Sequence, residues 1–570
     1  MKELEAQSLK VVEPLQPDCR WWGIGSNESG VGLREYDNMM FKRVKVGAMS
    51  KPIQQQHHGG REWGASALYR KIPARLLVCL GMVIIASGCK VGPEFCRPSV
   101  ALPADWEVQP QSLSAGEQAE ISCWWKQLNA PELDLMIEHV VRSNLSLREA
   151  LHRIEEARAI ERATAALSRP DASATGSSLY KQFSKTGNAF IPQSSAFQLH
   201  SVGFDTSWEM DLWGKLKRLN AAAIADKNAL VEAYHDLVVS LCAETAKTFV
   251  EARTLQARLA IADRNLAIQA ETVKLAESKQ QAGLVTYLDV AQGLSEFHTT
   301  EASIPLMRQQ LQQAVLRLCV LQGYVPTLRS IEQLGGGPIP EVPLALNFGV
   351  PQDLLRRRPD IRKAEQDMIR ECERIGAATA DLYPQLTLTG VISVDSRNVE
   401  TLFTGESLAH SIGPSLRWNL LSFGRVKNRI AAQDEKFQAA VAKYRETILL
   451  ATEEALGSMV SFHEEHERKI ALTNATMASQ QAVELAVEQY RTGLVNFQSV
   501  LETQRQLLIT EESLAASRGQ VVLNLIRTYK SIGGGWQCPL EYCIGTETEV
   551  ANLPTPIAPL KVDQEGNILR

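Results

Sequence analysis

The chain has 570 residues, a formal charge of -5 at neutral pH, 45% hydrophobic residues and 22% charged residues. These proportions are typical of a globular protein that is long enough to bury a substantial core. The weakly acidic balance, with no stripe of Lys and Arg, argues against nucleic acid as a partner, because neutralising phosphate groups requires clustered positive charge.

The amino-terminal segment, residues 1–88, is predicted to be an extension followed by an export signal. Within it, three basic residues precede an apolar run from Leu76 to Ala86, and small residues at 86–88 stand directly before Cys89. A run of eleven residues is too short to cross about 30 Å of hydrocarbon as a helix, but it suits the apolar region of a signal peptide. Small residues followed by Cys resemble the signal of bacterial lipoproteins, which implies a covalent lipid on Cys89. An ordinary signal peptide with an incidental Cys is the alternative.

Residues 200–212 are the first clear strand candidate, since apolar and polar residues alternate along them. The apolar face carries five residues: Val202, Phe204, Trp208, Met210 and Leu212. The same alternation recurs at 385–395 and 411–421, and it is weak at 171–183. Strands of about 9 to 11 residues with Trp near their ends are typical of an outer-membrane barrel, whose apolar face points outward. A soluble sandwich, with the apolar face inward, gives the same alternation, so the strands alone leave both interpretations open.

Two long helices are predicted at residues 214–283 and 424–493, where no proline interrupts the sequence. Apolar residues recur there at spacings of three and four, for example from Val231 to Ala252 in the first segment. This heptad-like spacing predicts helices that pack against other helices. At 1.5 Å per residue each would extend about 100 Å, which requires a partner along the whole face.

The sequence is internally duplicated. At an offset of 210 positions the matching pairs include Gly214 with Gly424, Tyr234 with Tyr444, Gly283-Leu284-Val285 with Gly493-Leu494-Val495, and Gly323 with Gly533. Upstream, Pro170 matches Pro384 at an offset of 214. A constant offset over so long a stretch indicates the repetition of one structural unit.

The repetition divides the chain after residue 88 into a first unit at 89–340, a second at 341–533 and a tail at 534–570. Each unit contributes two strands, so one chain has four. Four strands cannot close a membrane barrel, because known barrels begin at eight strands and each unpaired backbone group in lipid costs several kcal/mol. A barrel therefore needs several copies, and three copies related by cyclic symmetry would supply twelve strands.

The segment RRRPDIRKAEQDMIRECERIGAATADLYPQLTLTG, at residues 356–390, closely resembles the signature of the TolC-like outer-membrane efflux channels, in their lipoprotein branch of nodulation and multidrug export proteins. Further segments carry the same resemblance, at 124–150, 208–218 and 415–428. The resemblance implies a mainly α-helical fold with membrane β-strands. Three copies would form a twelve-stranded barrel in the outer membrane, and their long antiparallel coiled-coil helices would continue it as a periplasmic tunnel.

The resemblance also implies a function and partners. It implies the outer-membrane channel of a tripartite efflux system, a passive homotrimeric conduit that exports small molecules such as drugs and toxic compounds. Its partners would be outer-membrane lipid, a periplasmic adaptor protein and an inner-membrane efflux pump. The alternative is a lipid-anchored coiled-coil scaffold between the envelope layers. A scaffold shares the long helices and the lipid, but it does not need alternating strands with outward Trp208 and Trp418.

Under this resemblance, residues 283–287 and 493–497 are tips at which a long helix reverses at the periplasmic mouth. Gly283 and Gly493 tolerate the positive φ that such a turn requires. The apolar knob offered to the adaptor would consist of Leu284 and Val285 in the first tip, and Leu494 and Val495 in the second. The alternative is a pair of simple turns between helices, with no partner contact.

Asp289 lies just after the first tip, where the second unit has Ser499. In the family, carboxylates near this position form rings that constrict the closed mouth and favour cations. With three copies, Asp289 would contribute three negative charges. A solvated charge at the helix tip is the alternative.

The ten cysteines lack the close paired spacing of a zinc site. In an oxidising compartment Cys538 and Cys543 are able to pair, which leaves this pairing open. Three others lie in apolar helical segments and are predicted to be buried thiols: Cys242, Cys319 and Cys372.

No pattern in the sequence indicates an enzyme. His463 and His466 stand at helical spacing among Glu residues, but without the H-E-x-x-H arrangement of a zinc protease. No nucleophile elbow or phosphate-binding glycine loop is present in the sequence. We therefore predict no catalysis, no metal and no cofactor other than the covalent lipid on Cys89.

Overall fold

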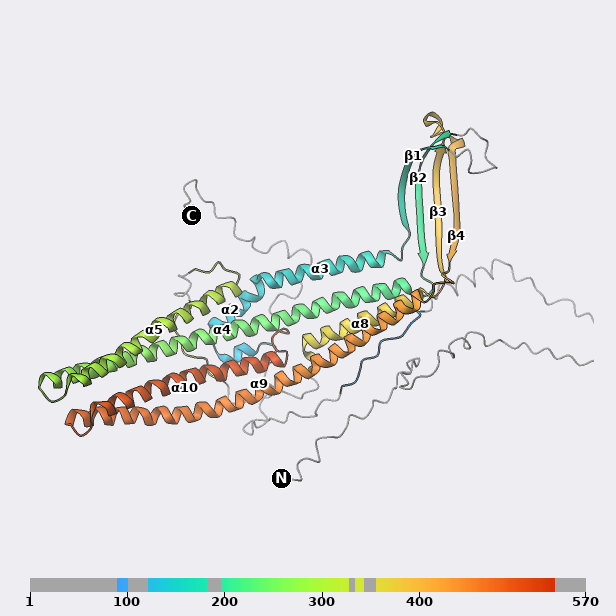
Figure 1. Ribbon diagram of the computed structural model, residues 1–570. Coiled ribbons are helices and arrows are strands. Elements are labelled where there is room, and N and C mark those ends of the chain that lie inside the picture. The colour runs from blue at the N-terminus through green and yellow to red at the C-terminus, as the bar shows by residue number, and fades with distance from the viewer. Residues whose placement is uncertain (1–89, 101–120, 183–195, 328–333, 343–354, 539–570) are drawn as a thin grey trace, which may run out of the picture.

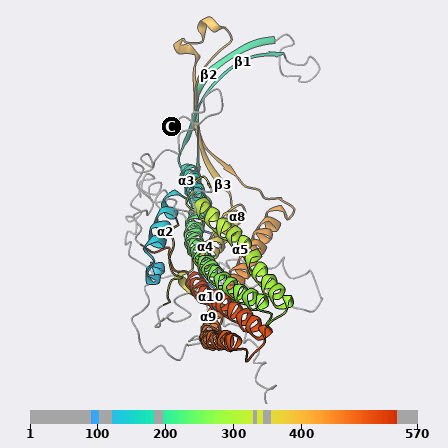
Figure 2. The same cartoon turned by 90° about the vertical axis from the view of Figure 1, so that its left-hand side faces the viewer.

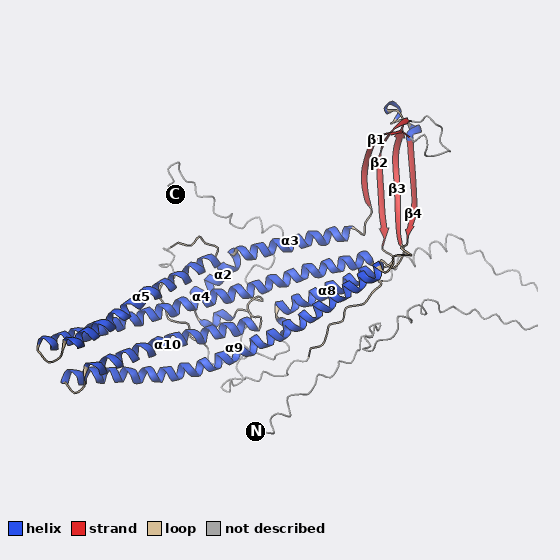
Figure 3. Ribbon diagram, viewed as in Figure 1, coloured by secondary structure: helices blue, strands red, loops and turns tan. Residues whose placement is uncertain are grey.

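The computed structural model describes residues 90–100, 121–182, 196–327, 334–342 and 355–538. Figure 1 shows long helices that run side by side, with a four-stranded sheet standing at one end of them. Coloured by secondary structure, the long helices and the strands fall into two separate regions, with only short helical turns at the far end of the sheet (Figure 3). The fold is thus mainly α-helical with one β region, as predicted.

Each unit contains a shorter helix, two strands and two further helices, in the same order. The first unit has α3 (Leu145–Ala166), β1 (Asp171–Gln182), β2 (Ala196–Met210), α4 (Lys215–Gln281) and α5 (Tyr287–Leu321). The second has α8 (Pro359–Ala380), β3 (Gln385–Ser396), β4 (Leu408–Arg417), α9 (Arg425–Thr492) and α10 (Phe497–Ser531). Smaller elements are η2 (Trp124–Leu128), α2 (Pro131–Ser143), η3 (Val399–Thr401) and η4 (Gly405–Ser407). The predicted internal duplication is confirmed.

The two long helices are α4, with 67 residues, and α9, with 68. Each follows a glycine with positive φ, Gly214 or Gly424, and each ends beside another, Gly283 or Gly493. Between those glycines no proline removes a backbone N–H donor, so the hydrogen-bond ladder continues through the whole helix. α5 and α10, with 35 residues each, return along part of α4 and α9 (Figure 1), and α3 and α8 also pack against the long helices, so several shorter helices together provide the partners that such a length requires. Within the described ranges, no helix is both long enough and apolar enough to cross a bilayer.

The strands form one antiparallel sheet in the order β1-β2-β3-β4, so the weak candidate at 171–183 is a strand, β1. Phe204 lies opposite Ala174 on one side and opposite Ile392 on the other. Phe204 is 64% exposed, and Ile412 on the same face is 79% exposed. The apolar face is therefore not turned into a protein core, and the soluble-sandwich interpretation is wrong.

The other face of the sheet is mainly polar, although it also carries Leu179, Leu199 and Val391. On β2 and β3 it carries Ser201, Asp205, Ser207, Glu209, Thr387, Thr389, Ser393 and Asp395. The Ser201 hydroxyl donates a hydrogen bond to the Asp395 carboxylate across 2.6 Å, which joins the two strands on this face. β1 and β4 are the outer strands, and the described residues give neither of them a second neighbour. The view in Figure 2 shows that the far ends of β1 and β2 curve to one side.

The largest core lies where η2, α2 and α3 meet α4 and the carboxyl end of α10. Trp124 and Trp125 are fully buried there, and Trp124 stacks on Tyr529 of α10 with ring centroids 5.4 Å apart. This core joins the beginning of the first unit to the end of the second. It therefore holds the two units together near the middle of the helices.

A disulfide joins Cys123 to Cys538 across 415 positions of sequence, beside the same core. This bond answers the question that the sequence left open: Cys538 pairs with Cys123 and not with Cys543, which lies outside the described residues. Sequence spacing does not identify this partner, because the fold brings the segment after α10 back to the start of η2. The predicted buried thiols are confirmed: Cys242, Cys319 and Cys372.

Residues 334–342, in the segment that joins the units, lie against α4. The buried guanidinium of Arg253 donates to the carbonyl oxygens of Gly335, at 3.0 Å, and Leu334, at 3.4 Å. A methyl group on Gly337 would approach the same guanidinium to 3.0 Å, so this segment is closely packed. The contact fastens the connection to the side of the long helix.

Candidate functional site

The first hairpin tip is a left-handed helix end. At Gly283 φ is +73°, a value at which a side chain would be strained. The Leu284 N–H donates to the Lys279 carbonyl and the Gly283 N–H donates to the Gln280 carbonyl, both at 2.9 Å. This pair of bonds is a Schellman motif, which satisfies the last carbonyl groups of α4 and reverses the chain.

The second tip has the same construction. At Gly493 φ is +82°, and the Leu494 N–H donates to the Gln489 carbonyl at 2.8 Å. The side chain of Asn496 then caps α10 by accepting a hydrogen bond from the Ser499 N–H at 3.0 Å. The two helix reversals therefore have the same geometry, and both lie at the positions predicted from the duplicated sequence.

The tips lie at the end of the helices opposite the sheet (Figure 1). Leu284 is 72% exposed and Leu494 is 77% exposed, whereas Val285 and Val495 are half-buried. Each knob thus consists of one projecting leucine above one valine that packs partly into its own hairpin. A single exposed leucine is normal on a protein surface, so the distinctive feature is that Leu284 and Leu494 occupy equivalent places on two turns of the same geometry.

The aromatic residues of the two tips differ in a way that sequence reasoning missed. Tyr287 is 68% exposed, but its counterpart Phe497 is only 2% exposed and packs in a cluster with Val290 and Val500. Gly293 makes room for this ring, since a methyl group there would lie 3.2 Å from Phe497. The one available signal was the glycine, whose lack of a side chain permits the close approach of the first hairpin to the second.

Asp289 is half-buried in the first turn of α5 and faces the end of α9. Burial raises the pKa of the Tyr490 hydroxyl, and the negative charge of Asp289 adds to this rise. Lys279 lies over the Tyr490 ring, 4.2 Å from its centroid, and also donates to the Tyr490 carbonyl. The tip thus brings one carboxylate, one ammonium group and one phenol together, although the sequence suggested the carboxylate alone.

Cys89, the predicted lipid attachment point, lies outside the described residues, which begin with Lys90. The backbone of Lys90 lies where the sheet meets the helices, since a methyl group on Gly214 would lie 3.1 Å from its Cα atom. The following residues run along α8, and Arg97 there pairs with Glu365 through two hydrogen bonds, at 2.7 and 2.5 Å. The chain that follows Cys89 is therefore held at the sheet end of the helices.

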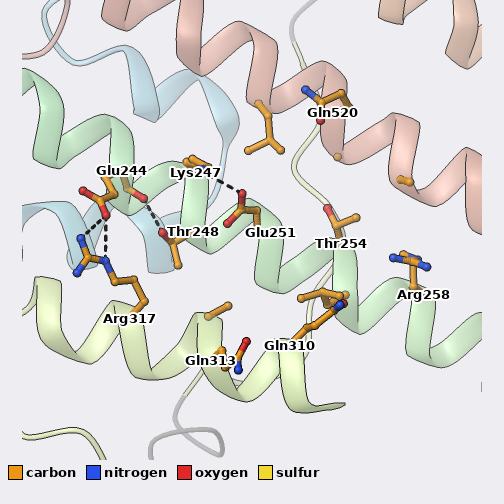
Figure 4. Close-up of a pocket in the computed structure, with 15 residues that line it drawn as sticks. Glu244, Lys247, Thr248, Glu251, Thr254, Arg258, Gln310, Gln313, Arg317 and Gln520 are labelled. Atoms are coloured by element: carbon orange, nitrogen blue, oxygen red, sulfur yellow. Dashed lines mark hydrogen bonds and ion pairs between the residues drawn. The ribbon is translucent and has the colours of Figure 1, made fainter. Parts of the chain in front are cut away.

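A polar groove lies between α4, α5 and α10 (Figure 4). Its charged side chains are paired: Arg317 of α5 donates to Glu244 of α4 at 2.9 Å, and Arg258 of α4 donates to Glu512 of α10 at 3.0 Å. The sequence did not indicate this groove, because charges at helical spacing are usually a solvated face. The first ion pair joins the two helices of the first hairpin, α4 and α5. The second joins α4 to α10 and thereby fixes the first hairpin against the second.

The chain matches the model of one protein family, described as outer membrane efflux protein, over residues 136–323 and 350–534. These two segments cover more than half of the sequence, and each lies largely in one of the duplicated units. The chain belongs to the outer membrane efflux protein family. Family members are transport channels, so this protein is the outer-membrane component of an efflux system, located in the outer membrane and extending into the periplasm.

Curated relatives support this family membership over most of their length. Nodulation protein T of Rhizobium leguminosarum bv. trifolii is 29% identical over 433 residues, which is 76% of this chain and 91% of that protein. The toluene efflux pump outer membrane protein TtgF of Pseudomonas putida is 28% identical over 479 residues, which is 80% of this chain and 96% of that protein.

Solved structures share the fold. The outer-membrane channel OprN superposes with a TM-score of 0.73 at 29% identity, covering 79% of this chain and all of that one. The Campylobacter jejuni CmeC outer membrane channel gives the same TM-score at 18% identity, over 78% of this chain and 95% of that one. The exposed apolar sheet and these channels favour the efflux function over the envelope scaffold, which would not need such a sheet.

Proposed function

We propose that three copies of this chain form a passive conduit through the outer membrane that continues as a helical tunnel in the periplasm. The sheet carries this proposal: its apolar face is exposed, its other face is mainly polar, and its outer strands lack a second neighbour among the described residues. In lipid, the unpaired backbone groups of β1 and β4 cost several kcal/mol each, so another sheet must pair with them. Three copies give the twelve strands that close the barrel.

The cargo of this conduit is a range of small molecules, drugs and toxic compounds, which an inner-membrane pump delivers through a periplasmic adaptor. The name of the relative TtgF, a toluene efflux pump outer membrane protein, supports organic solvents as part of that range. The conduit carries out no catalysis of its own. Its selectivity follows from the pump that feeds it and from the groups that line its mouth.

The adaptor docks at the tips. Leu284 and Leu494 project from the end of the molecule opposite the sheet, which is the end that faces the inner membrane. Both sit on a rigid Schellman turn, so they are presented without further loss of backbone freedom. An apolar groove between adaptor helices would cover them, and the surrounding polar residues would set the register.

A covalent lipid on Cys89 fits the same orientation. Lys90 is held where the sheet meets the helices, the level at which a membrane-embedded sheet leaves the bilayer. Acyl chains attached one residue earlier would enter the lipid beside the barrel, each buried methylene contributing about 0.8 kcal/mol. The lipid would then anchor each copy independently of barrel closure.

Asp289 would form a ring of three carboxylates at the mouth of a trimer. Its charge acts on Tyr490 of α9, which puts it close to the second hairpin of the same copy. Such a ring attracts cations and repels anions at the narrowest part of the path. In the trimer, single-channel recordings of Asp289→Ala would show a loss of cation preference.

The proposed function is tested by complementation in a strain that lacks the chromosomal copy. We expect the wild-type chain to restore resistance, and the double variant Leu284→Asp with Leu494→Asp to lose it while still assembling in the outer membrane. Leu135→Asp is the matched control, because Leu135 is comparably exposed on α2, away from the tips. A wild-type chain that restores no resistance contradicts the efflux function. Full resistance in the double variant would contradict adaptor docking at the tips, but it would leave the efflux function standing.

A further inference from the structure

Contacts within each unit of the chain occur twice. The Trp208 indole donates to the Ser168 carbonyl at 2.9 Å, and its counterpart Trp418 donates to Leu382, the counterpart of Ser168, at 3.1 Å. The strand registers also correspond: Thr175 lies opposite Gly203 in the first unit, and Thr389 lies opposite Gly413 in the second. The offsets of 210 and 214 positions therefore relate matching contacts in the structure as well as matching residues in the sequence.

Contacts between the units occur once. β2 pairs with β3, α4 packs on α8, and α4 also packs on α10. In the duplication, β2 and α4 of the first unit correspond to β4 and α9 of the second. Likewise, β3, α8 and α10 of the second unit correspond to β1, α3 and α5 of the first. Among the described residues the corresponding surfaces of the counterparts β4, α9, β1, α3 and α5 have no such neighbour, and Leu449 on α9 is 66% exposed where its counterpart on α4, Val239, is buried.

We propose that Lys436 on α9 forms an ion pair with Glu156 on α3 of the neighbouring copy, at the place that Asp226 and Arg370 occupy within one chain. The proposal rests on the trimer proposed above, and it specifies which residues meet. α9 takes the place of α4, and α3 of the neighbouring copy takes the place of α8.

The ion pair is the clearest element of this interface. Within one chain, Arg370 on α8 lies 2.9 Å from Asp226 on α4. The counterpart of Arg370 is Glu156 on α3, and the counterpart of Asp226 is Lys436 on α9. Both charges are reversed, so the pair stays complementary. Glu156 and Lys436 are exposed, and neither has an ion-pair partner among the described residues.

An aromatic contact repeats in the same way. Trp213 stacks on Tyr383 with ring centroids 4.7 Å apart, where the sheet meets the helices. Their counterparts are Phe423 and Arg169, and a guanidinium group binds an aromatic face by a cation–π interaction. Phe423 is 96% exposed and has a φ of +46°, which a bulky residue rarely adopts. A neighbouring Arg169 would cover this ring.

The sheet edge follows the same rule. Thr206 of β2 lies opposite Gly390 of β3, and the Thr206 hydroxyl would lie 2.8 Å from a methyl group on that glycine. The counterparts are Leu416 on β4 and Gly176 on β1, so glycine again stands where the opposite side chain approaches. A methyl group on Gly176 meets nothing within 4 Å in one chain, which leaves space for Leu416 of the neighbouring copy.

The test is site-directed cross-linking of the full-length chain in native membranes, with Cys96 and Cys543 replaced by Ser. We expect a short bismaleimide to link Glu156→Cys with Lys436→Cys into two-chain and three-chain products, and either single variant to give none. The matched control pairs Asp226→Cys with Arg370→Cys, the equivalent positions within one chain. That control should be bridged within one chain, giving no two-chain or three-chain product.

Two outcomes overturn the proposal in distinguishable ways. If an amine cross-linker shows trimers while Glu156→Cys with Lys436→Cys forms no linked chains, the proposed contact is wrong and the trimer stands. If no cross-linker shows an assembly, the trimer itself fails. As a second measurement, Lys436→Glu and Glu156→Lys should each lower the temperature at which trimers dissociate, and the combined reversal should restore it.

Discussion

Phe497 and Tyr287 occupy equivalent positions in the two hairpins but have opposite surroundings. Phe497 packs against Tyr490, with ring centroids 5.2 Å apart, and is closed in by Val290 and Val500. Tyr287 projects into solvent. A duplicated sequence therefore does not imply duplicated packing, because the first hairpin lies against the second on one side and is open on the other.

We expect Phe497→Ala to destabilise the tip region by about 3 to 5 kcal/mol, since it removes a buried ring and leaves a cavity. Tyr287→Ala should change stability by less than about 0.5 kcal/mol, as an exposed substitution usually does. Hydrogen exchange of the backbone amides in residues 270–300 and 480–510 measures both effects. Equal protection in the two variants would show that the two tips are packed alike, contrary to the structure.

Single residues also set the limit of sequence-based prediction. The helix ends at Gly283 and Gly493 could be predicted from the sequence, because a positive φ at a helix end favours glycine strongly. The burial of Cys242 was readable from its apolar helical neighbours. The disulfide partner of Cys538 could not be predicted from the sequence, since a pairing across 415 positions depends on the whole fold.

Among the elements, the long helices are easier to predict than the strands. α4 and α9 follow from an apolar spacing of three and four with no proline, and their limits follow from flanking glycines. β1 gave a weak signal because its outward positions include Ala174 and Gly176 rather than large apolar residues. It is a strand because β2 offers a ladder along its whole length, which is a tertiary contact that local sequence does not record.

The disulfide between Cys123 and Cys538 joins η2 to the segment after α10 and closes a very long loop. We expect Cys123→Ser to lower the free energy of unfolding by about 2 to 5 kcal/mol, because the unfolded chain regains the freedom that the bond removes. Urea unfolding followed by tryptophan fluorescence measures this loss, since Trp124 and Trp125 are buried beside the bond.

The matched control for this prediction is the double variant Cys123→Ser with Cys538→Ser. It should lose no more stability than Cys123→Ser alone, because either substitution removes the same bond. An additive loss would mean that the two sulfur atoms act separately and that the bond does not stabilise this core.

At the scale of the whole molecule, the two ends of the chain carry different chemistry. One end has a sheet with an exposed apolar face, and the residue after Cys89 lies beside the junction of that sheet with the helices. The other end has two exposed leucines on rigid turns. Long helices separate the ends, so a single fold connects the exposed apolar sheet to the proposed docking surface at the tips.

One copy leaves surfaces uncovered on both the sheet and the long helices. The sheet has two outer strands without a second neighbour among the described residues, and α9 exposes a face whose counterpart on α4 is covered. The sequence predicted this incompleteness from the strand count. The structure adds the residues by which a second copy would remove it.

The molar mass of the full-length protein, extracted in mild detergent and measured by light scattering with the detergent subtracted, tests this account most directly. We predict a mass three times that of one mature chain, stable on dilution. A monodisperse single chain with a folded sheet would contradict it, because one copy would then satisfy its own strand edges.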